Sequence, residues 1–276
     1  MRERRMWKDC KDFWKEVEMG DIRGRYEFQV RSYECGREGF AHLATVCNYL
    51  QEAASMHAEA LGFSRVNFAA AHEDISWVLT RLRVKMERYP RWGERVEVET
   101  YPRGGRKVVA WRDFILREAL SGEVLGVATS EWMIINLTTR KVVAIPEMVF
   151  EVAKDLPLDA AVLGVEPFCA RMKFPDEGVR EVMEFLAQNG QIDLNGHVNN
   201  AHYIEWMMEP CYRAGAAAVL PREVEVVFRS ETLALEKVMV EMCEGANVGE
   251  RFHCVRSVDG RMHVVGRTVA SEEGRK

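Results

Sequence analysis

The chain contains one structural unit twice, and this internal repeat constrains its fold more than any other feature. Apolar residues recur at spacings of three and four from about residue 42 to 61 and again from about 200 to 219, which predicts two amphipathic helices. Each predicted helix is followed by segments of alternating apolar and polar residues, with predicted turns at 102–105, 121–122 and 259–260. Each half therefore has one long helix followed by an antiparallel meander.

The two halves can be aligned by the residues that they share. Tyr49 matches Tyr203 at an offset of 154 (203 − 49), and Glu94 matches Glu236 at an offset of 142 (236 − 94). The difference of 12 residues (154 − 142) falls in the loop after the first helix. A curled sheet and a helix can bury their apolar faces against each other. We therefore expect an α+β chain of two tandem hotdog domains, each a long central helix wrapped by an antiparallel sheet.

This pattern divides the chain into four segments. A charged stretch, residues 1–20, is expected to form a short helical extension that packs on the body. The first hotdog is expected over residues 21–150 and the second over residues 177–272. Residues 151–176 between them contain three prolines and no sustained periodicity, which favours a crossing linker.

Composition narrows the class of protein. With 47% apolar and 29% charged residues, the chain is typical of soluble globular proteins. A formal net charge of -5 argues against nucleic acid as the main partner. The seven cysteines form no C-x-x-C pair, which favours a reducing compartment and argues against structural zinc. Because neither a signal peptide nor a membrane-spanning run is evident, we expect a cytoplasmic protein.

A polar trio, Asp193, Asn195 and His197, stands directly before the second helix. In an extended segment, alternate side chains share one face, so these three would point the same way. Asn199 and Asn200 are good helix-capping residues, and free N–H groups at a helix N-terminus can stabilise negative charge. Polar residues of this kind are also common in turns and caps. The trio alone therefore leaves a purely structural role open.

Comparison of the two copies favours a functional role for the trio. At the offset of 154, its positions in the first copy hold Gly39, Ala41 and Leu43, so the fold itself does not require three polar side chains. Glu231 is a second difference, because the offset of 142 places Tyr89 at the equivalent position. Alternation does not show whether Glu231 faces solvent or the site.

A family resemblance rests on the segment from Asp193 to Asn200, followed by Tyr203, Ile204 and Trp206. It closely resembles the D-x-N-x-H-V-N-N-x-x-Y-x-x-W segment of acyl-acyl carrier protein thioesterases from plants and bacteria. The first half resembles the same family at residues 48–54, 77–81, 88–94, 112–113 and 145–147. The likeness extends from about residue 25 to 240.

The resemblance implies an enzyme that hydrolyses fatty acyl-acyl carrier protein, releases the fatty acid and ends fatty acid synthesis, with no metal or cofactor. By position, Asp193, Asn195, His197 and Glu231 match the family's catalytic residues. Plant members have a cysteine after the glutamate, whereas this chain has Thr232, so a cysteine nucleophile at that position is excluded. We expect Glu231 to activate water, while Asn195, His197 and N–H groups at the helix N-terminus polarise the carbonyl. Asp193 is expected to orient the Asn195 and His197 side chains. Either Glu231 or Asp193 could be the general base.

The resemblance also implies an acyl pocket in the first hotdog and an acidic carrier protein whose acyl chain is attached to 4'-phosphopantetheine. Candidate pocket residues, which could equally be plain core, are Val46, Tyr49, Leu50, Ala53 and Trp77. Candidate docking residues, which could equally form a solvent-exposed strand face, are Arg81, Arg83, Lys85, Arg88, Arg91, Arg106 and Lys107.

Three other functions stay open at this point: a thioesterase for acyl-coenzyme A, a hotdog hydratase-dehydratase, and a non-catalytic acyl-binding protein. The sequence does not fix the length, saturation or branching of the acyl chain. It also does not decide between a monomer and a homodimer.

Overall fold

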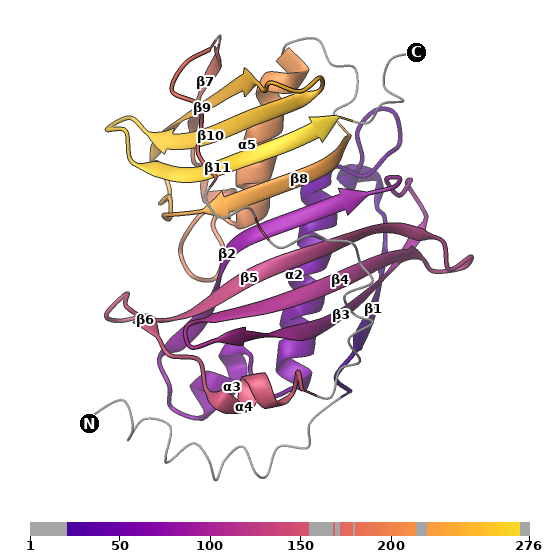
Figure 1. Ribbon diagram of the computed structural model, residues 1–276, viewed down its shortest axis with the longest axis vertical. Coiled ribbons are helices and arrows are strands. Elements are labelled where there is room, and N and C mark those ends of the chain that lie inside the picture. The colour runs from indigo at the N-terminus through magenta and orange to yellow at the C-terminus, as the bar shows by residue number, and fades with distance from the viewer. Residues whose placement is uncertain (1–20, 155–167, 169–171, 179, 214–219, 271–276) are drawn as a thin grey trace.

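Two copies of one arrangement make up the computed structural model, which describes residues 21–154, 168, 172–178, 180–213 and 220–270 (Figure 1). The first copy comprises strand β1 (Gly24–Gln29), helix α2 (Leu43–Ala60) and strands β2 (Ile75–Met86), β3 (Arg95–Arg106), β4 (Val109–Glu118) and β5 (Val124–Asn136). The second comprises β7 (Arg180–Leu186), α5 (Asn200–Arg213), β8 (Pro221–Phe228), β9 (Lys237–Glu244), β10 (Glu250–Ser257) and β11 (Met262–Ala270). The expected tandem hotdog is confirmed.

Shorter elements distinguish the copies. Each has a 3₁₀ turn before its long helix, η1 (Ser32–Glu34) or η3 (Asn189–Gln191). Among the described residues, only the first copy also has α3 (Arg65–Ala70), β6 (Val142–Val143) and α4 (Glu147–Glu151). The predicted extension, 1–20, and most of the predicted linker lie outside the described residues. No helix within the described ranges is long and apolar enough to cross a membrane.

A single antiparallel sheet runs through both copies in the order β1-β3-β4-β5-β2-β8-β11-β10-β9-β7. The copies join where β2 pairs with β8, with Val84 opposite Val224. Figure 1 shows α2 and α5 on the same face of this sheet. The two helices therefore share one side of a continuous surface.

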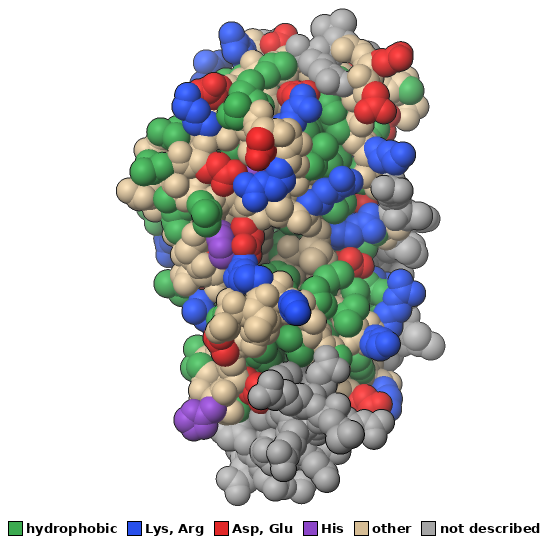
Figure 2. All heavy atoms as spheres, turned by 90° about the vertical axis from the view of Figure 1, so that its left-hand side faces the viewer, with side chains coloured by type: hydrophobic (Ala, Val, Ile, Leu, Met, Phe, Trp, Pro, Cys, Tyr) green, Lys and Arg blue, Asp and Glu red, His purple; other side chains and the backbone are tan. Residues whose placement is uncertain are grey.

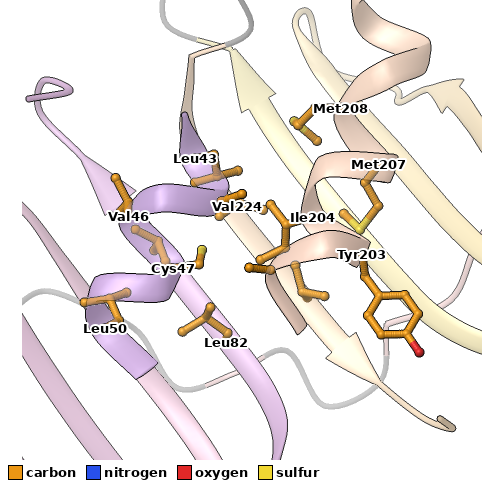
Figure 3. Close-up of a cluster of buried hydrophobic side chains, with 14 of the residues drawn as sticks. Leu43, Val46, Cys47, Leu50, Leu82, Tyr203, Ile204, Met207, Met208 and Val224 are labelled. Atoms are coloured by element: carbon orange, nitrogen blue, oxygen red, sulfur yellow. The ribbon is translucent and has the colours of Figure 1, made fainter. Parts of the chain in front are cut away.

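One hydrophobic core spans the two copies (Figure 3). Leu50 of α2, Ile204 of α5 and Val224 of β8 belong to it, and each is at most 1% exposed. Burying one side chain of this size stabilises the fold by about 1.5–3 kcal/mol. Because α2 and α5 bury their apolar faces in one cluster, the two hotdogs form a single packed body.

Backbone hydrogen bonds correct the alignment of the two copies. The Gly36 N–H donates to the Phe40 carbonyl, and the Asp193 N–H donates to the His197 carbonyl, which gives an offset of 157 (193 − 36) instead of 154. The sequence alignment was wrong by three residues because three residues make almost one helical turn and keep the same apolar face aligned. The first copy therefore has 15 extra residues (157 − 142) after its helix, and α3 lies among them.

The predicted turn at 102–105 is also wrong. Strand β3 continues through this segment to Arg106, and its pairing with β4 shifts register between Pro102 and Gly104. Gly104 has a φ of +106°, which side chains rarely adopt, and an added Cβ at Gly105 would lie 2.3 Å from the Val109 carbonyl oxygen. The glycines therefore form a β-bulge instead of a chain reversal.

Two buried histidines link stability to pH. The His57 Nε2 atom lies 2.8 Å from the Asp21 carbonyl oxygen, and its Nδ1 atom lies 2.8 Å from the Arg112 Nη1 atom. Burial, together with the charge of Arg112, lowers the pKa of His57 to about 4. Burial likewise lowers the pKa of His253 to about 3. Both side chains are therefore neutral in the folded protein at pH values where free histidine takes up a proton.

Acidification is expected to destabilise the protein from about pH 6.5 downwards, above the range in which most carboxylates titrate. Between about pH 6.5 and 4, both histidines are protonated in the unfolded chain but not in the folded one, so the free energy of unfolding falls as pH falls. The slope approaches about 1.4 kcal/mol per pH unit for each histidine. Urea unfolding at pH 7.5, 6.0 and 5.0 measures it. Equal midpoints at pH 7.5 and 5.0 would contradict the prediction.

Candidate active site

The polar trio lies on a tight turn directly before α5, so the predicted extended segment is wrong. The Asp193 N–H donates to the His197 carbonyl at 2.7 Å, and the Gly196 N–H donates to the Asp193 carbonyl at 3.0 Å. Asp193 Oδ1 accepts the backbone N–H groups of Asn195 at 2.7 Å and His197 at 3.3 Å. Asp193 therefore fixes the backbone of the turn, as short polar side chains do in Asx turns, and does not hold the other two side chains.

The first copy makes the same turn without the trio. With the corrected offset of 157, the positions of the trio are occupied by Gly36, Glu38 and Phe40 instead of the residues predicted from the sequence. Gly39 and Gly196 both have positive φ values, +79° and +82°, at equivalent places in the two turns. Because a glycine replaces the aspartate and the turn still forms, the trio is an addition that the fold does not require.

Glu231 and His197 form a pair beside the turn. The His197 Nε2 atom lies 3.0 Å from Glu231 Oε2, and the side chains are 16% and 41% exposed, respectively. Glu231 follows β8, and its other oxygen, Oε1, forms an ion pair with Arg140 of the first copy. The carboxylate is therefore held at both oxygens and remains partly open to water.

Asn195 is held by a second arginine of the first copy. The Arg65 Nη1 atom donates to Asn195 Oδ1 at 2.6 Å and to the Leu194 carbonyl at 3.2 Å. A third contact between the copies joins the Asn200 amide to Gln51 Oε1 at 3.1 Å. The active-site candidates of the second copy are thus held in part by the first.

A cavity of about 820 Å³ opens beside the turn. Asn195 and Leu194 line one part of it, and aromatic residues of the first copy, including Phe63, Trp77 and Trp111, line another. Figure 2 shows the face on the left-hand side of Figure 1, hollowed near its middle and bordered by acidic, basic and hydrophobic side chains. Of the four predicted catalytic residues, only Asn195 belongs to the lining.

The predicted pocket residues divide into two groups. Tyr49 and Trp77 line the cavity. Val46, Leu50 and Ala53 have no exposed surface and belong to the core, so the expectation that they form the pocket wall is wrong. Both groups lie on one apolar helix face or the strand beside it, which is why periodicity did not separate them.

The N-terminus of α5 offers fewer free donors than expected. Asn199 Oδ1 accepts the Ala201 N–H at 2.9 Å, and the Asn199 carbonyl accepts the His202 N–H at 3.0 Å. The capping role of Asn199 is confirmed, but these two N–H groups are already paired. Polarising a carbonyl at this site therefore falls mainly to side chains.

Two family models match the chain: the acyl-ACP thioesterase N-terminal domain over residues 23–153 and the acyl-ACP thioesterase C-terminal domain over residues 176–269. The chain belongs to the acyl-ACP thioesterase family. Within the described residues, no cluster of three or more histidine, cysteine or acidic side chains could hold a metal ion.

Several curated relatives in this family come from plants. The chloroplastic palmitoyl-acyl carrier protein thioesterase of Gossypium hirsutum is 33% identical over 256 residues, which cover 87% of this chain and 62% of the relative. The chloroplastic oleoyl-acyl carrier protein thioesterase 1 of Arabidopsis thaliana is 34% identical over 204 residues, which cover 66% and 53%. The chain thus spans about 60% of the length of the first relatives that it matches.

Solved structures share the fold. The 12:0-ACP thioesterase from Umbellularia californica has a TM-score of 0.75 and 24% identity, and the comparison covers 95% of this chain and 97% of that one. An acyl-ACP thioesterase from Bacteroides thetaiotaomicron has a TM-score of 0.76 and 22% identity, with coverages of 90% and 97%. The double hotdog is therefore the same architecture in all three proteins.

Thr232, the residue after Glu231, is buried. Its side chain has no exposed surface, and its carbonyl accepts the Val198 N–H at 3.0 Å. The position therefore serves to anchor the turn to the segment after β8. It presents no group to a substrate.

Arg81 and Arg83, two of the seven predicted docking residues, lie at the junction of the two copies. The Arg81 Nη2 atom lies 3.0 Å from Glu225 Oε1, and the Arg83 Nη2 atom lies 2.7 Å from Glu223 Oε1. Both arginine side chains are largely buried. They join β2 to β8 and offer little free charge to a partner.

The other predicted docking residues differ in exposure. Lys85 is half-buried opposite Glu223, and Arg88 forms ion pairs with Glu94 and Glu123. The Arg91 guanidinium lies over the Phe40 ring, 4.6 Å from its centroid. Arg106 and Lys107 are exposed at the turn between β3 and β4. This turn is therefore the best remaining candidate for docking.

Proposed function

We propose that the protein hydrolyses the thioester of fatty acyl-acyl carrier protein and releases the free fatty acid. One observation carries the proposal: the His197–Glu231 pair stands beside Asn195, which lines a cavity walled by aromatic residues. An apolar chain fits such a cavity, and its thioester would then lie near Asn195. Membership of the acyl-ACP thioesterase family supports the carrier protein as the substrate class.

In the proposed reaction, Glu231 takes a proton from a water molecule whose oxygen attacks the thioester carbon. The Asn195 amide donates a hydrogen bond to the carbonyl oxygen as negative charge develops there. The carbon–sulfur bond then breaks, and the proton passes from Glu231 to the departing sulfur. The products are the fatty acid and the free 4'-phosphopantetheine thiol. General-base help of this kind contributes about 10²–10⁴-fold to the rate.

The contacts of the two carboxylates favour Glu231 over Asp193 as the general base. Asp193 Oδ1 accepts two backbone N–H groups of its own turn. Glu231 is 41% exposed, and its Oε2 atom lies 3.0 Å from the His197 Nε2 atom. We therefore assign proton transfer to Glu231 and the support of the turn to Asp193.

Parallel assays with one acyl chain on carrier protein and on coenzyme A test the proposal. The expected result is release of thiol and free fatty acid, faster from the carrier protein. Faster release from coenzyme A would favour the acyl-coenzyme A alternative. A hydratase-dehydratase would release no thiol, and an acyl-binding protein would bind substrate without turnover. Profiling the fatty acids released in a bacterial host would then give the chain length.

We propose that an acidic carrier protein docks near Arg106 and Lys107. Both side chains are exposed, and β3 ends on the same left-hand side of Figure 1 as the hairpin of β5 and β6 that carries Arg140. Charges at the rim of an interface mainly affect the rate of association and its salt dependence. The turn between β3 and β4 would thus guide the carrier toward the cavity.

Reversing both charges, Arg106→Glu with Lys107→Glu, is expected to raise KM for acyl-carrier protein several-fold at low salt. High salt should reduce the difference, because the attraction is screened within about 10 Å at 0.1 M salt. Hydrolysis of a small acyl thioester should stay unchanged. Arg37→Glu, at a side chain 82% exposed, is the matched control. An equal rise in KM for both substrates would exclude docking at this turn.

We propose a cytosolic location. The five cysteines within the described residues are thiols and not disulfides, and four of them are buried. A reducing compartment keeps such thiols from forming disulfides. Fractionation of cells that express the tagged protein tests this, and recovery in a membrane or secreted fraction would contradict it.

A further inference from the structure

Arg65 reaches the catalytic turn from an element that the second copy lacks. It is the first residue of α3, which lies within the 15 extra residues (157 − 142) of the first copy. Two contacts fix α3: the Ser64 side chain accepts the Asn67 N–H, and Phe68, which is 1% exposed, packs in an apolar cluster beside Trp77. The inserted helix is therefore a firm support for Arg65.

We propose that Arg65 is a positioning residue that sets the orientation of the Asn195 amide, an inference that rests on the proposed function. A guanidinium has only donors, so it can bind the amide only through Oδ1. The Arg65 Nη1 atom lies 2.6 Å from that oxygen. The NH₂ group on the opposite side of the planar amide is then directed away from Arg65, and Asn195 lines the cavity. The amide thus presents a donor to the thioester carbonyl.

Without Arg65, the amide is free to rotate by half a turn. Its oxygen would then face the carbonyl oxygen, where it repels the negative charge that develops in the reaction. The second contact of Arg65, 3.2 Å from its Nη1 atom to the Leu194 carbonyl, ties the guanidinium to the same turn. Arg65 also lines the cavity, and in this proposal it acts on the rate through Asn195.

Arg140 holds Glu231 in a parallel way. It lies in the hairpin between β5 and β6, another part of the first copy with no counterpart among the described residues of the second. Its φ of +57° places the backbone in the left-handed region, which is unusual for a residue other than glycine. Asn195 and Glu231 of the second hotdog are thus each held by an arginine of the first hotdog. These arginines lie in α3 and in the hairpin between β5 and β6.

The contact of Arg65 with Asn195 should affect the rate far more than stability. Both side chains are exposed, and exposed polar contacts contribute little to folding, about 0–1 kcal/mol. Loss of one oxyanion donor lowers kcat about 10²–10³-fold. Arg65→Met should cost less, about 10–100-fold, because the free amide still visits the productive orientation. KM for a small acyl thioester should change less than about two-fold.

A double-mutant cycle tests the proposal with Arg65→Met, Asn195→Ala and the two combined. A small acyl thioester as substrate removes any effect on docking. We expect Arg65→Met to lower kcat in the wild-type background and to cause no further loss in the Asn195→Ala background. Arg65→Lys should restore part of the rate, because lysine keeps a donor. Arg37→Met is the matched control, and melting temperatures should stay equal in all variants.

Each other outcome would contradict either the positioning role of Arg65 or the proposed function. Equal losses from Arg65→Met in both backgrounds would overturn the positioning role, because Arg65 would then act independently of Asn195. A wild-type rate in Arg65→Met with a slow Asn195→Ala variant would overturn the inference and leave the proposed function standing. A wild-type rate in Asn195→Ala would remove the role of Asn195 and with it the inference. No hydrolysis by the unmodified protein would refute the proposed function itself.

Discussion

Glu231→Gln is expected to lower kcat for thioester hydrolysis by about 10²–10⁴-fold and to leave the fold intact. The amide has nearly the same shape as the carboxylate but cannot take a proton from water. Because the Glu231 side chain is 41% exposed, its ion pair with Arg140 contributes little to stability. Thiol release gives the rate, and the melting temperature checks the fold.

The Asp193→Asn variant distinguishes the role of Asp193 from that of Glu231. Its amide oxygen can still accept the N–H groups of Asn195 and His197, so the turn should survive. If Glu231 is the base, this variant keeps far more activity than Glu231→Gln. Glu184→Gln, at an exposed side chain outside the cavity lining, is the matched control. A fast Glu231→Gln variant together with an inactive Asp193→Asn variant would reverse the assignment.

The sequence predicted the fold through periodicity, and it predicted the chemistry through a difference between the copies. Apolar spacing located α2 and α5, and alternation located the strands. The same spacing hid the three-residue error in the alignment, because a shift by nearly one turn leaves Leu50 and Ile204 on the apolar face. The absence of the trio from the first copy held after the correction, since Gly36, Glu38 and Phe40 stand there.

Contacts between residues far apart in the sequence could not be predicted from local sequence patterns. Arg65 and Asn195 are 130 positions apart, and Arg140 and Glu231 are 91 apart. The one sequence signal was the insertion after the first helix, which marked the segment that holds Arg65. Alternation placed Arg81 on a strand face but could not show that the partner strand supplies an acidic residue opposite.

The stability of the junction between the two copies should depend strongly on Arg81. Its guanidinium pairs with Glu225, which is 1% exposed, and the other carboxylate oxygen of Glu225 has no hydrogen-bond partner within the described residues. Arg81→Met would leave this carboxylate buried without its cation. Removing one member of a buried ion pair typically costs about 3–5 kcal/mol. We expect the free energy of unfolding to fall by about that amount, as measured by urea unfolding.

Replacing both members, Arg81→Met with Glu225→Met, should recover most of that loss. The cost of the single variant comes from an unpaired buried charge, and the double variant has none, while two apolar side chains fill the junction between β2 and β8. Arg25→Met is the matched control, because Arg25 is 61% exposed and its partner Glu99 keeps Arg23. A single variant within about 1 kcal/mol of the unmodified protein would mean that water reaches Glu225 and screens its charge. A double variant no more stable than the single one would mean instead that the arginine contributes through packing at the junction of β2 and β8, because its removal would then cost the same whether or not a charge faces it.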